Sequence, residues 1–231
     1  QRLFVELLLR HADEVLENLD SSTPVPPLRL LLLGTAGTGK TTSTQTALQE
    51  LRRKLTATGY PLEFFRVAAY TGCAAFNVRF GASTLHRLFD MRNPFKWTSL
   101  EERSARLHAF QKKMEQTRLL IFDEISMLGR QIMGKIDDRC SQAKPNAKSH
   151  AVPTLGGMSC VGVGDPAQCP PIKDDVFYDD LPHKDTRTDP EATRVRMSNS
   201  GLHVFSTFHD VVVLGTCHRI RKMQEDGESP K

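Results

Sequence analysis

The stretch LRLLLLGTAGTGKTT, residues 28–42, decides the fold. It begins as an unbroken apolar run of strand length, and such a strand is covered on both faces, as in a parallel sheet. It continues as a loop with three glycines, Gly34, Gly37 and Gly39, and passes directly into a segment with helical spacing. A buried strand, a glycine-rich loop and a helix in succession are typical of an α/β domain that binds its ligand at the strand's carboxyl end.

The same alternation of strand and helix continues along the chain. Further apolar runs of strand length lie at residues 63–70, 118–124, 158–165 and 210–215, and spacing predicts helices over residues 3–19, 40–55, 71–78, 100–115 and 126–140. Five buried strands that alternate with helices predict an α/β domain with a mainly parallel sheet flanked by helices. We expect the polar stretch of residues 173–196 to be a long surface loop.

Composition narrows the class of protein. The chain has 231 residues, of which 39% are hydrophobic, so it is long enough for one large domain. A formal net charge of +4 permits a polyanionic partner without requiring one. The five cysteines contain no C-x-x-C pair, which argues against a zinc site or a disulfide framework and favours a reducing compartment.

No apolar run approaches membrane-spanning length and no cleavable signal is visible, so we expect an intracellular protein with no membrane association. The chain begins at Gln1 without a methionine, and we expect it to be a segment of something longer.

The loop GTAGTGKT, residues 34–41, matches the phosphate-binding pattern G-x-x-x-x-G-K-[ST] in the strand–loop–helix context that the pattern requires. Its glycines let backbone N–H groups and the helix N-terminus face an anion. Lys40 is expected to reach the β and γ phosphates of ATP, and the Thr41 hydroxyl to ligate Mg²⁺. The predicted nucleotide-binding residues of this loop are Gly34, Thr35, Ala36, Gly37, Thr38, Gly39, Lys40, Thr41 and Thr42.

The sequence IFDEIS supplies two adjacent carboxylates at the end of an apolar run. An Asp at the end of a strand beside a phosphate-binding loop is able to hold Mg²⁺, which is the role we expect for Asp123. Glu124 is the candidate general base for the attacking water. The pair favours hydrolysis of a nucleoside triphosphate over phosphoryl transfer to a small molecule.

The sequence GDPAQCPP follows another apolar run, at residues 158–165. The carboxyl ends of parallel strands meet at one edge of a sheet, so this turn should project toward the same edge as Lys40 and Asp123. A neutral amide both donates and accepts hydrogen bonds, so it suits contact with a γ-phosphate oxygen and with the attacking water. Gln168 is therefore the candidate γ-phosphate sensor.

Four ordered segments, GTAGTGKT, TGCAAFNVRFGASTLHRLF, DEISM and GDPAQCPP, together resemble motifs I, Ia, II and III of superfamily 1B DNA helicases. The resemblance is to the Pif type, which includes the helicase modules of rolling-circle transposons, and it covers residues 1 to about 219. It implies a P-loop (RecA-like) motor domain that couples ATP hydrolysis to 5′-to-3′ translocation on single-stranded DNA and to unwinding at duplex junctions. It further implies a monomeric motor in genome maintenance (repair or recombination), in the nucleus or mitochondrion of a eukaryote.

The resemblance assigns roles at the nucleotide. By similarity, Gln1 recognises adenine, Lys40 and Thr41 hold the phosphates and Mg²⁺, and Asp123 binds the metal. Glu124 activates the water, and Gln168 reports the γ-phosphate state to the DNA cleft. Arg219, in the segment VVVLGTCHRI, corresponds to an arginine finger.

It also suggests DNA contacts. Thr71 and Gly72 open a predicted helix and would bind a DNA phosphate. His86 corresponds to a histidine near the strand path, whereas from its own surroundings alone a satisfied local histidine is the favoured interpretation. Phe95 and Trp97 lie in an insertion at about residues 90–116, where the family has a duplex-splitting wedge, and they suit base stacking. A small apolar patch that anchors the insertion is the open alternative for both.

The resemblance divides the chain into an N-terminal helix with the adenine-side segment (residues 1–27), the first motor domain (residues 28–219) and the start of a connection to a second motor domain (residues 220–231). Nothing in the chain resembles that second domain. Three features depart from the family: Cys169 stands where leucine is usual, Ile220 where glutamine is usual, and GAST, residues 81–84, where a glycine pair usually precedes Thr-x-His. Two other hypotheses stay open, a nucleotide-responsive DNA-binding remnant that cannot translocate and a non-helicase P-loop ATPase.

Overall fold

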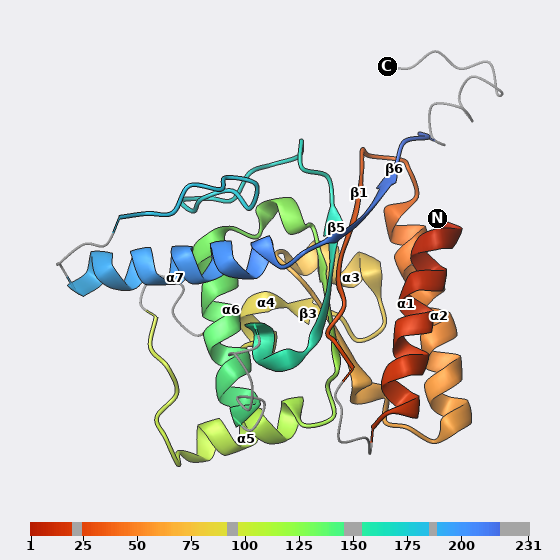
Figure 1. Cartoon of the computed structure of the whole chain (residues 1–231), viewed down its shortest axis with the longest axis horizontal. Coiled ribbons are helices and arrows are strands. Elements are labelled where there is room, and N and C mark those ends of the chain that lie inside the picture. The colour runs from red at the N-terminus through yellow and green to blue at the C-terminus, as the bar shows by residue number, and fades with distance from the viewer. Residues whose placement is uncertain (20–24, 92–96, 146–153, 185–188, 218–231) are drawn as a thin grey trace.

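The structure is a computed structural model that describes residues 1–19, 25–91, 97–145, 154–184 and 189–217, with only the backbone described at positions 189 and 190 (Figure 1). Among these residues, six strands form one sheet in the order β3-β2-β4-β5-β1-β6. The strands are β1 Arg29–Gly34, β2 Phe65–Ala69, β3 Ser83–Thr84, β4 Leu119–Asp123, β5 Ser159–Gly164 and β6 Asp210–Leu214, and all the pairs are parallel. The predicted α/β class with a mainly parallel sheet is confirmed.

Helices cover both faces of this sheet. They are α1 Arg2–Glu17, α2 Lys40–Thr58, α3 Gly72–Val78, α4 Leu85–Leu88, α5 Ala105–Met114, α6 Arg130–Ala143 and α7 Asp189–Ser206. Short 3₁₀ turns occupy Leu62–Phe64, Ile125–Met127 and Thr154–Gly157. In Figure 1, α1 and α2 lie side by side on one face, and α6 and α7 lie on the other.

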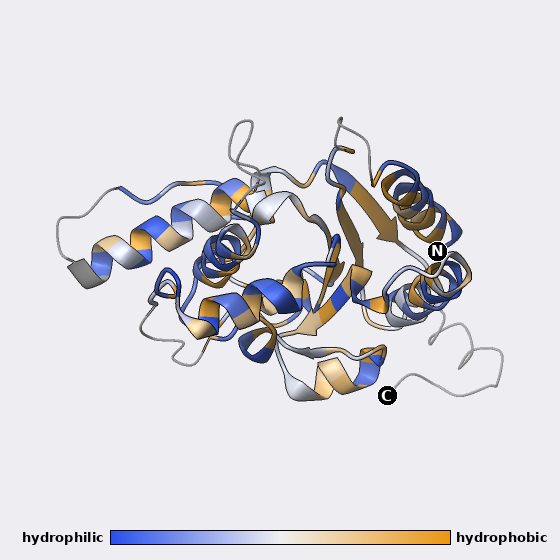
Figure 2. Cartoon of the chain, turned by 90° about the horizontal axis from the view of Figure 1, so that it is seen from below, coloured by the Kyte–Doolittle hydropathy of each residue, from blue (hydrophilic) through white to orange (hydrophobic). Residues whose placement is uncertain are grey.

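The alternation of strand side chains divides the core into two layers. Leu30 and Leu32 of β1 pack with Phe4 of α1 and Leu48 of α2, whereas Leu31 faces the side of α6 and α7. Successive side chains of a strand point to opposite faces, so an unbroken apolar run is what a central strand needs. Figure 2 shows these apolar strands between helices whose outer faces are hydrophilic.

The expectation of a surface loop over residues 173–196 is wrong from residue 189 onward, because α7 begins there. Only a few apolar side chains of α7 are buried, among them Val195, Met197, Val204 and Phe205. α7 packs against α6 through close backbone approach at Gly134 of α6 and Gly201 of α7 rather than through a broad apolar stripe. Hydrophobic spacing in the sequence therefore does not reveal this helix. The predicted helix over residues 100–115 is also shorter, because Ser104 caps α5 by accepting a hydrogen bond from the N–H of Leu107.

The last predicted strand forms, but it is not covered on both faces. β6 lies at the edge of the sheet beside β1, and it buries Val212 and Leu214 while Val211 and Val213 are 51% and 69% exposed. The expectation of five doubly covered strands therefore fails at β6. Within the described part of the chain, no helix is long and apolar enough to cross a membrane.

Candidate nucleotide-binding and hydrolysis site

The sheet register brings the predicted motifs to one edge. Asp123 at the end of β4 lies opposite Val163 of β5, and Leu33 near the end of β1 lies opposite Gly164 at the end of β5. The loop after β1, the carboxylates after β4 and the turn after β5 therefore leave the sheet side by side. The structure thus brings together the three segments that sequence analysis assigned to phosphate binding, metal binding and sensing.

The glycine-rich loop has the backbone that a phosphate cradle requires. Gly37 and Gly39 have φ values of 82° and 91°, in the left-handed region that favours glycine. The Lys40 ammonium donates to the carbonyls of Gly34 at 2.7 Å and Thr35 at 3.0 Å. The positive charge of Lys40 therefore lies over the loop at the start of α2, where Thr41 and Thr42 are exposed.

The N-terminal glutamine contacts this loop from outside. Gln1 Nε2 donates to the Thr38 carbonyl at 3.0 Å, and a Cβ added at Gly39 would lie 2.3 Å from Gln1 Nε2. The packing of α1 on α2 holds Gln1 there, since Phe4 and Leu8 are buried in the core. Gln1 is thus beside the glycine-rich loop, and its role at the adenine stays a prediction.

The two adjacent carboxylates differ in environment. Burial raises the pKa of Asp123 to about 6, partly opposed by the hydrogen bond from the Glu124 N–H; the Glu124 charge raises this pKa further and the Lys40 charge lowers it. Burial penalises the charged carboxylate, so a cation beside Asp123 would favour ionisation. Glu124 has φ 56° and ψ 48°, a left-handed conformation that costs a non-glycine residue about 1–3 kcal/mol.

The oxygen ligands here fit an Mg²⁺ ion that is bound together with a nucleotide better than a metal ion that protein side chains coordinate alone. Among the described residues, no three His, Cys, Asp or Glu side chains are grouped to hold a metal ion. Mg²⁺ commonly takes one or two protein oxygens and completes its shell with water and substrate phosphates. The Thr41 hydroxyl and the Asp123 carboxylate are oxygens of this type, beside the loop that would hold the phosphates.

Thr71 links the end of β2 to the candidate general base. Its hydroxyl accepts a hydrogen bond from the N–H of Ala74 at 3.1 Å, which caps α3, and donates to Glu124 Oε2 at 3.5 Å. The predicted role of Thr71 was a DNA contact alone. Its place beside Glu124 follows from the register that pairs Ala69 of β2 with Asp123 of β4, which the two apolar runs do not encode separately.

The GDPAQ turn is organised by its aspartate. Asp165 is buried, and its carboxylate accepts from the N–H of Ala167 at 3.0 Å, while its carbonyl accepts from the N–H of Gln168 at 3.0 Å. The side chains of Gln168 and Cys169 are exposed. The departure at Cys169 therefore changes an exposed side chain and leaves the core intact.

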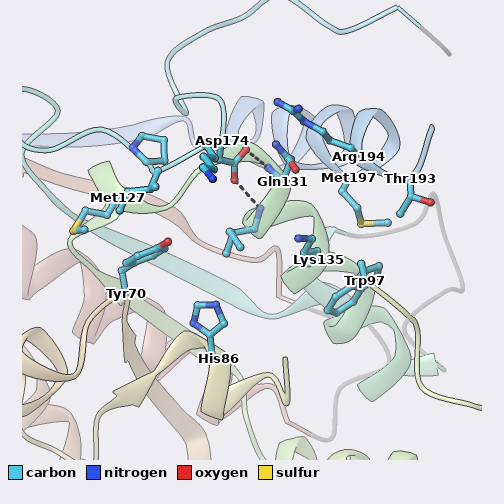
Figure 3. A pocket seen from close by; sticks show the side chains of 14 residues that line it. Tyr70, His86, Trp97, Met127, Gln131, Lys135, Asp174, Thr193, Arg194 and Met197 are labelled. Carbon is cyan, nitrogen blue, oxygen red and sulfur yellow. Dashed lines mark hydrogen bonds between the residues drawn. The ribbon is translucent and has the colours of Figure 1, made fainter. Parts of the chain in front are cut away.

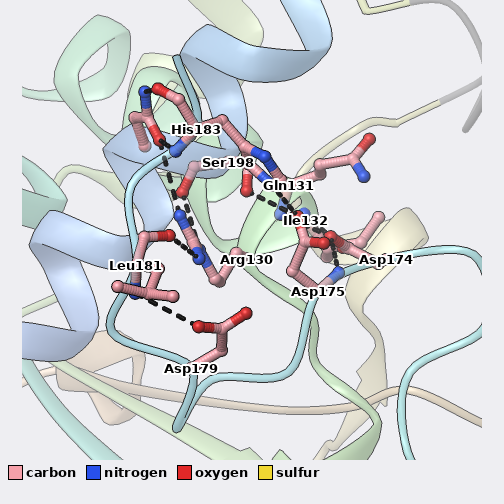
Figure 4. Close-up of polar contacts among 10 residues, drawn as sticks. Arg130, Gln131, Ile132, Asp174, Asp175, Asp179, Leu181, His183 and Ser198 are labelled. Carbon is pink, nitrogen blue, oxygen red and sulfur yellow. Dashed lines mark hydrogen bonds and ion pairs between the residues drawn. The ribbon is translucent and has the colours of Figure 1, made fainter.

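The chain after this turn is fastened to the start of α6 (Figure 4). Asp174 accepts from the N–H groups of Gln131 at 2.9 Å and Ile132 at 3.1 Å, which are otherwise unsatisfied at a helix N-terminus. The N–H of Arg130 donates to the Asp175 carbonyl at 3.0 Å. Since α6 follows Glu124 closely in the chain, the segments after β4 and β5 are joined beyond the sheet.

A buried arginine extends this connection to α7. The Arg130 guanidinium donates to the carbonyls of Leu181 at 2.9 Å and Ser198 at 3.3 Å (Figure 4). The Ser198 hydroxyl donates to the Asp175 carboxylate at 2.8 Å. The loop from Asp174 to Leu181 is therefore hydrogen-bonded to both α6 and α7.

The predicted DNA contacts are distributed along the same sheet edge. Thr71 and Gly72 open α3, and His86 lies on α4 with its ring 6.1 Å from that of Tyr70. Burial lowers the pKa of His86, and the Lys135 charge lowers it further.

Trp97 is partly buried against α6. Its indole N–H donates to Asp138 at 3.0 Å, and the Arg139 guanidinium lies 4.4 Å from the ring centroid. These contacts fit the anchoring alternative and leave the stacking role a prediction.

Phe95 and Arg219 lie outside the described residues. Cys217, which sequence analysis passed over, donates from its thiol to the Ala36 carbonyl at 3.4 Å, so the chain after β6 reaches the nucleotide loop.

Comparisons with known proteins agree with these motifs. The family described as PIF1-like helicase matches residues 10–178. An ATP-dependent DNA helicase of Candida albicans, PIF1, is 30% identical over 151 residues, which cover 65% of this chain and 15% of that protein.

Solved structures share the fold. Unliganded Pif1 from a Bacteroides species has a TM-score of 0.53 at 23% identity, covering 95% of this chain and 46% of that one. Bacteroides Pif1 in complex with ADP-AlF3 and single-stranded DNA has a TM-score of 0.50 at 21% identity, covering 94% and 46%. This chain thus spans less than half the length of each of these proteins.

Proposed function

This chain belongs to the PIF1-like helicase family, and from that membership we propose that it acts as the first motor domain of an ATP-dependent DNA helicase. The substrates are ATP and single-stranded DNA, with duplex junctions as the place of unwinding. The observation that carries the proposal is the register that brings Lys40, Glu124 and Gln168 to one sheet edge from neighbouring strands.

Each of these residues then has a separate role in ATP hydrolysis. Lys40 and the N–H groups of its loop hold the β and γ phosphates, and Gln1 lies beside the adenine. Glu124 takes a proton from the attacking water, and Gln168 orients that water against the γ-phosphate. Thr41 and Asp123 would hold Mg²⁺, which would supply neutralisation of the phosphate charge. Arg219 is the proposed arginine finger, by its resemblance to the family arginine in the segment VVVLGTCHRI.

Single-stranded DNA is the proposed partner along Thr71, Gly72 and His86. The Bacteroides Pif1 complex with ADP-AlF3 and single-stranded DNA supports both ligands for this family. Translocation in the 5′-to-3′ direction by a monomeric, intracellular motor, with a role in repair or recombination, belongs to the same proposal. The nucleotide-responsive DNA-binding remnant that cannot translocate remains the second candidate.

Three measurements on the same preparation test the proposal: binding of a fluorescent ATP analogue, anisotropy of a labelled oligothymidylate, and phosphate release with and without that DNA. We expect the chain to bind the ATP analogue, and Lys40→Ala to weaken that binding. We also expect the chain to bind the oligothymidylate and to hydrolyse ATP slowly, at a rate that the DNA increases. The matched control is Lys112→Ala, an exchange at an exposed lysine on α5. Hydrolysis that DNA leaves unchanged, together with no DNA binding, contradicts the helicase proposal and favours a non-helicase ATPase. Binding of both ligands without hydrolysis favours the remnant.

A further inference from the structure

A cavity of about 510 Å³ opens beside the strand ends, outside the nucleotide site (Figure 3). It is formed where the end of β2, α4, α6, α7 and the loop after β5 meet. Its volume lies within the range of about 300–1,000 Å³ that is usual for small-molecule sites. The nucleotide-site residues Lys40 and Asp123 do not line it, so it is a separate candidate site among the described residues.

Three aromatic rings contribute to its wall. Tyr70 and His86 meet edge to face, with an interplanar angle of 76°, and Trp97 lines another part. The indole N–H of Trp97 is engaged by Asp138 and its ring is stacked by the Arg139 guanidinium, so it offers the cavity a fixed apolar surface. Rigid rings of this kind suit a flat, unsaturated ligand.

The charges around the cavity favour an anion. Lys135 lies inside the lining, and the exposed Lys173 and Arg194 stand at the rim on different elements. Asp174 is the one acidic residue of the described lining, and its carboxylate is already engaged by backbone N–H groups at the start of α6. The cavity therefore combines a ring-lined interior with cations at its opening.

One polar group in the lining lacks a partner. The Nε2 atom of Gln131 is buried and makes no hydrogen bond to any described residue. Buried donors are nearly always satisfied, so such a group marks a position where an acceptor of a ligand would be favourable. The edges of nucleobases carry acceptors of this kind.

We propose that this cavity receives one unstacked base of the bound single strand, with the adjacent phosphates held by Lys173 and Arg194. The base lies against the ring of Tyr70, and the side chain of Gln131 rotates so that its amide donates to the edge of the base. Trp97 lies at the other end of the cavity (Figure 3). This inference rests on the proposed function and deepens it, because Tyr70 directly precedes Thr71, where a DNA phosphate is proposed to bind. A strand explains two separated cations better than a free nucleotide, which carries its phosphates at one end.

The test uses the 231-residue chain and a short oligothymidylate with one 2-aminopurine at successive positions. Anisotropy of an end label reports binding, and 2-aminopurine emission reports stacking on an aromatic ring. We expect one position at which emission falls on binding. Tyr70→Leu should restore that emission and weaken binding about tenfold, as expected for the loss of one base–aromatic stack.

A matched pair of surface variants keeps the test independent of folding. Arg194→Ala should weaken binding severalfold and flatten its salt dependence, because one phosphate contact is lost. Arg196→Ala, two residues away on α7, is exposed and outside the lining, and should bind as the original chain does.

Four results would overturn the inference. If the oligonucleotide binds with equal emission at every position, or if Arg194→Ala and Arg196→Ala behave alike, DNA is bound but not in this cavity, and the proposed function stands. The cavity is a free-nucleotide site if deoxyadenosine monophosphate binds to the chain and the oligonucleotide does not. In that case Arg194→Ala, but not Arg196→Ala, weakens the binding of the nucleotide. If no DNA binds, the proposed function and this inference fail together.

Discussion

Replacing Gly201 by alanine should force apart the two helices that flank the site. α6 and α7 meet at Gly134 and Gly201, where each glycine faces the backbone of the other helix. A Cβ at position 201 would lie 1.8 Å from the Arg130 carbonyl oxygen, whereas real contacts of this type stay at 3.0 Å or more. The helices would have to separate by more than about 1 Å, because the opposing atoms are backbone and cannot rotate away.

The expected loss of stability follows from two opposing effects. Overpacking of this kind costs about 1–3 kcal/mol, and here the displaced helix also carries the Arg130 contacts to Leu181 and Ser198. Alanine is favoured over glycine inside a helix by about 1 kcal/mol, which offsets part of that cost. We expect the free energy of unfolding to fall by about 2 kcal/mol and the Tm to fall by about 4–8 °C.

Urea denaturation followed by circular dichroism measures this change. The matched control is Gly215→Ala, since a Cβ at that position meets no heavy atom within 4 Å. The control should stay within about 0.5 kcal/mol of the original chain, as surface substitutions usually do. If Gly201→Ala is as stable as the control, the predicted steric clash between α6 and α7 is refuted, because no cost beyond the helix preference of alanine over glycine would then be needed.

Three further predictions concern the site and its surroundings. Glu124→Gln should retain ATP binding while phosphate release falls about 10²- to 10⁴-fold, as expected for loss of a general base; unchanged release would remove Glu124 from that role. Thr71→Val should lower the free energy of unfolding by about 1 kcal/mol, because the N–H of Ala74 loses its cap, whereas Thr71→Ser should stay within a few tenths; equal losses in urea titrations would contradict the capping role. Burial lowers the pKa of Lys144 to about 8; the Arg118 charge lowers it further and the Glu115 charge raises it. The charged ammonium therefore lowers the free energy of unfolding at any pH below 8, and this loss of stability fades as the pH rises from 8 toward about 10.5, the ordinary pKa of lysine. Lys144→Met should therefore be more stable by about 1 kcal/mol at pH 7, a figure reduced for the ammonium's contact with water, and the advantage should vanish by about pH 10.5; a difference independent of pH would contradict this.

The sheet and the site's position were predictable because both depend on local patterns. The apolar runs before Gly34, Asp123 and Asp165 identify central strands, and parallel strands share one ligand-binding edge. No knowledge of the strand order was needed for this step. The order itself, with β5 between β4 and β1, explains why the Gln168 turn lies between the other two motifs.

What escaped prediction depends on contacts between distant segments. α7 is held by backbone approach at Gly134 and Gly201 and by the Arg130 hydrogen bonds, and neither leaves a hydrophobic period. The exposure of Val211 and Val213 depends on the edge position of β6, which a single apolar run does not encode. Likewise, only tertiary packing brings Trp97 to Asp138 and forms the cavity between α4, α6 and α7.

The shortest connection between a bound strand and the hydrolytic chemistry passes through Thr71. A ligand shifts an equilibrium only by the difference in its affinity for the two states, so DNA acts on hydrolysis only through a group whose contacts it changes. The Thr71 hydroxyl already contacts Glu124 Oε2, and Tyr70, which precedes it, lines the cavity proposed for the base. A strand bound there needs to displace only this hydroxyl, with no movement of the sheet, to alter the orientation of Glu124. Acceleration of hydrolysis by DNA should therefore be smaller in Thr71→Val than in Thr71→Ser, even where both variants bind the strand equally.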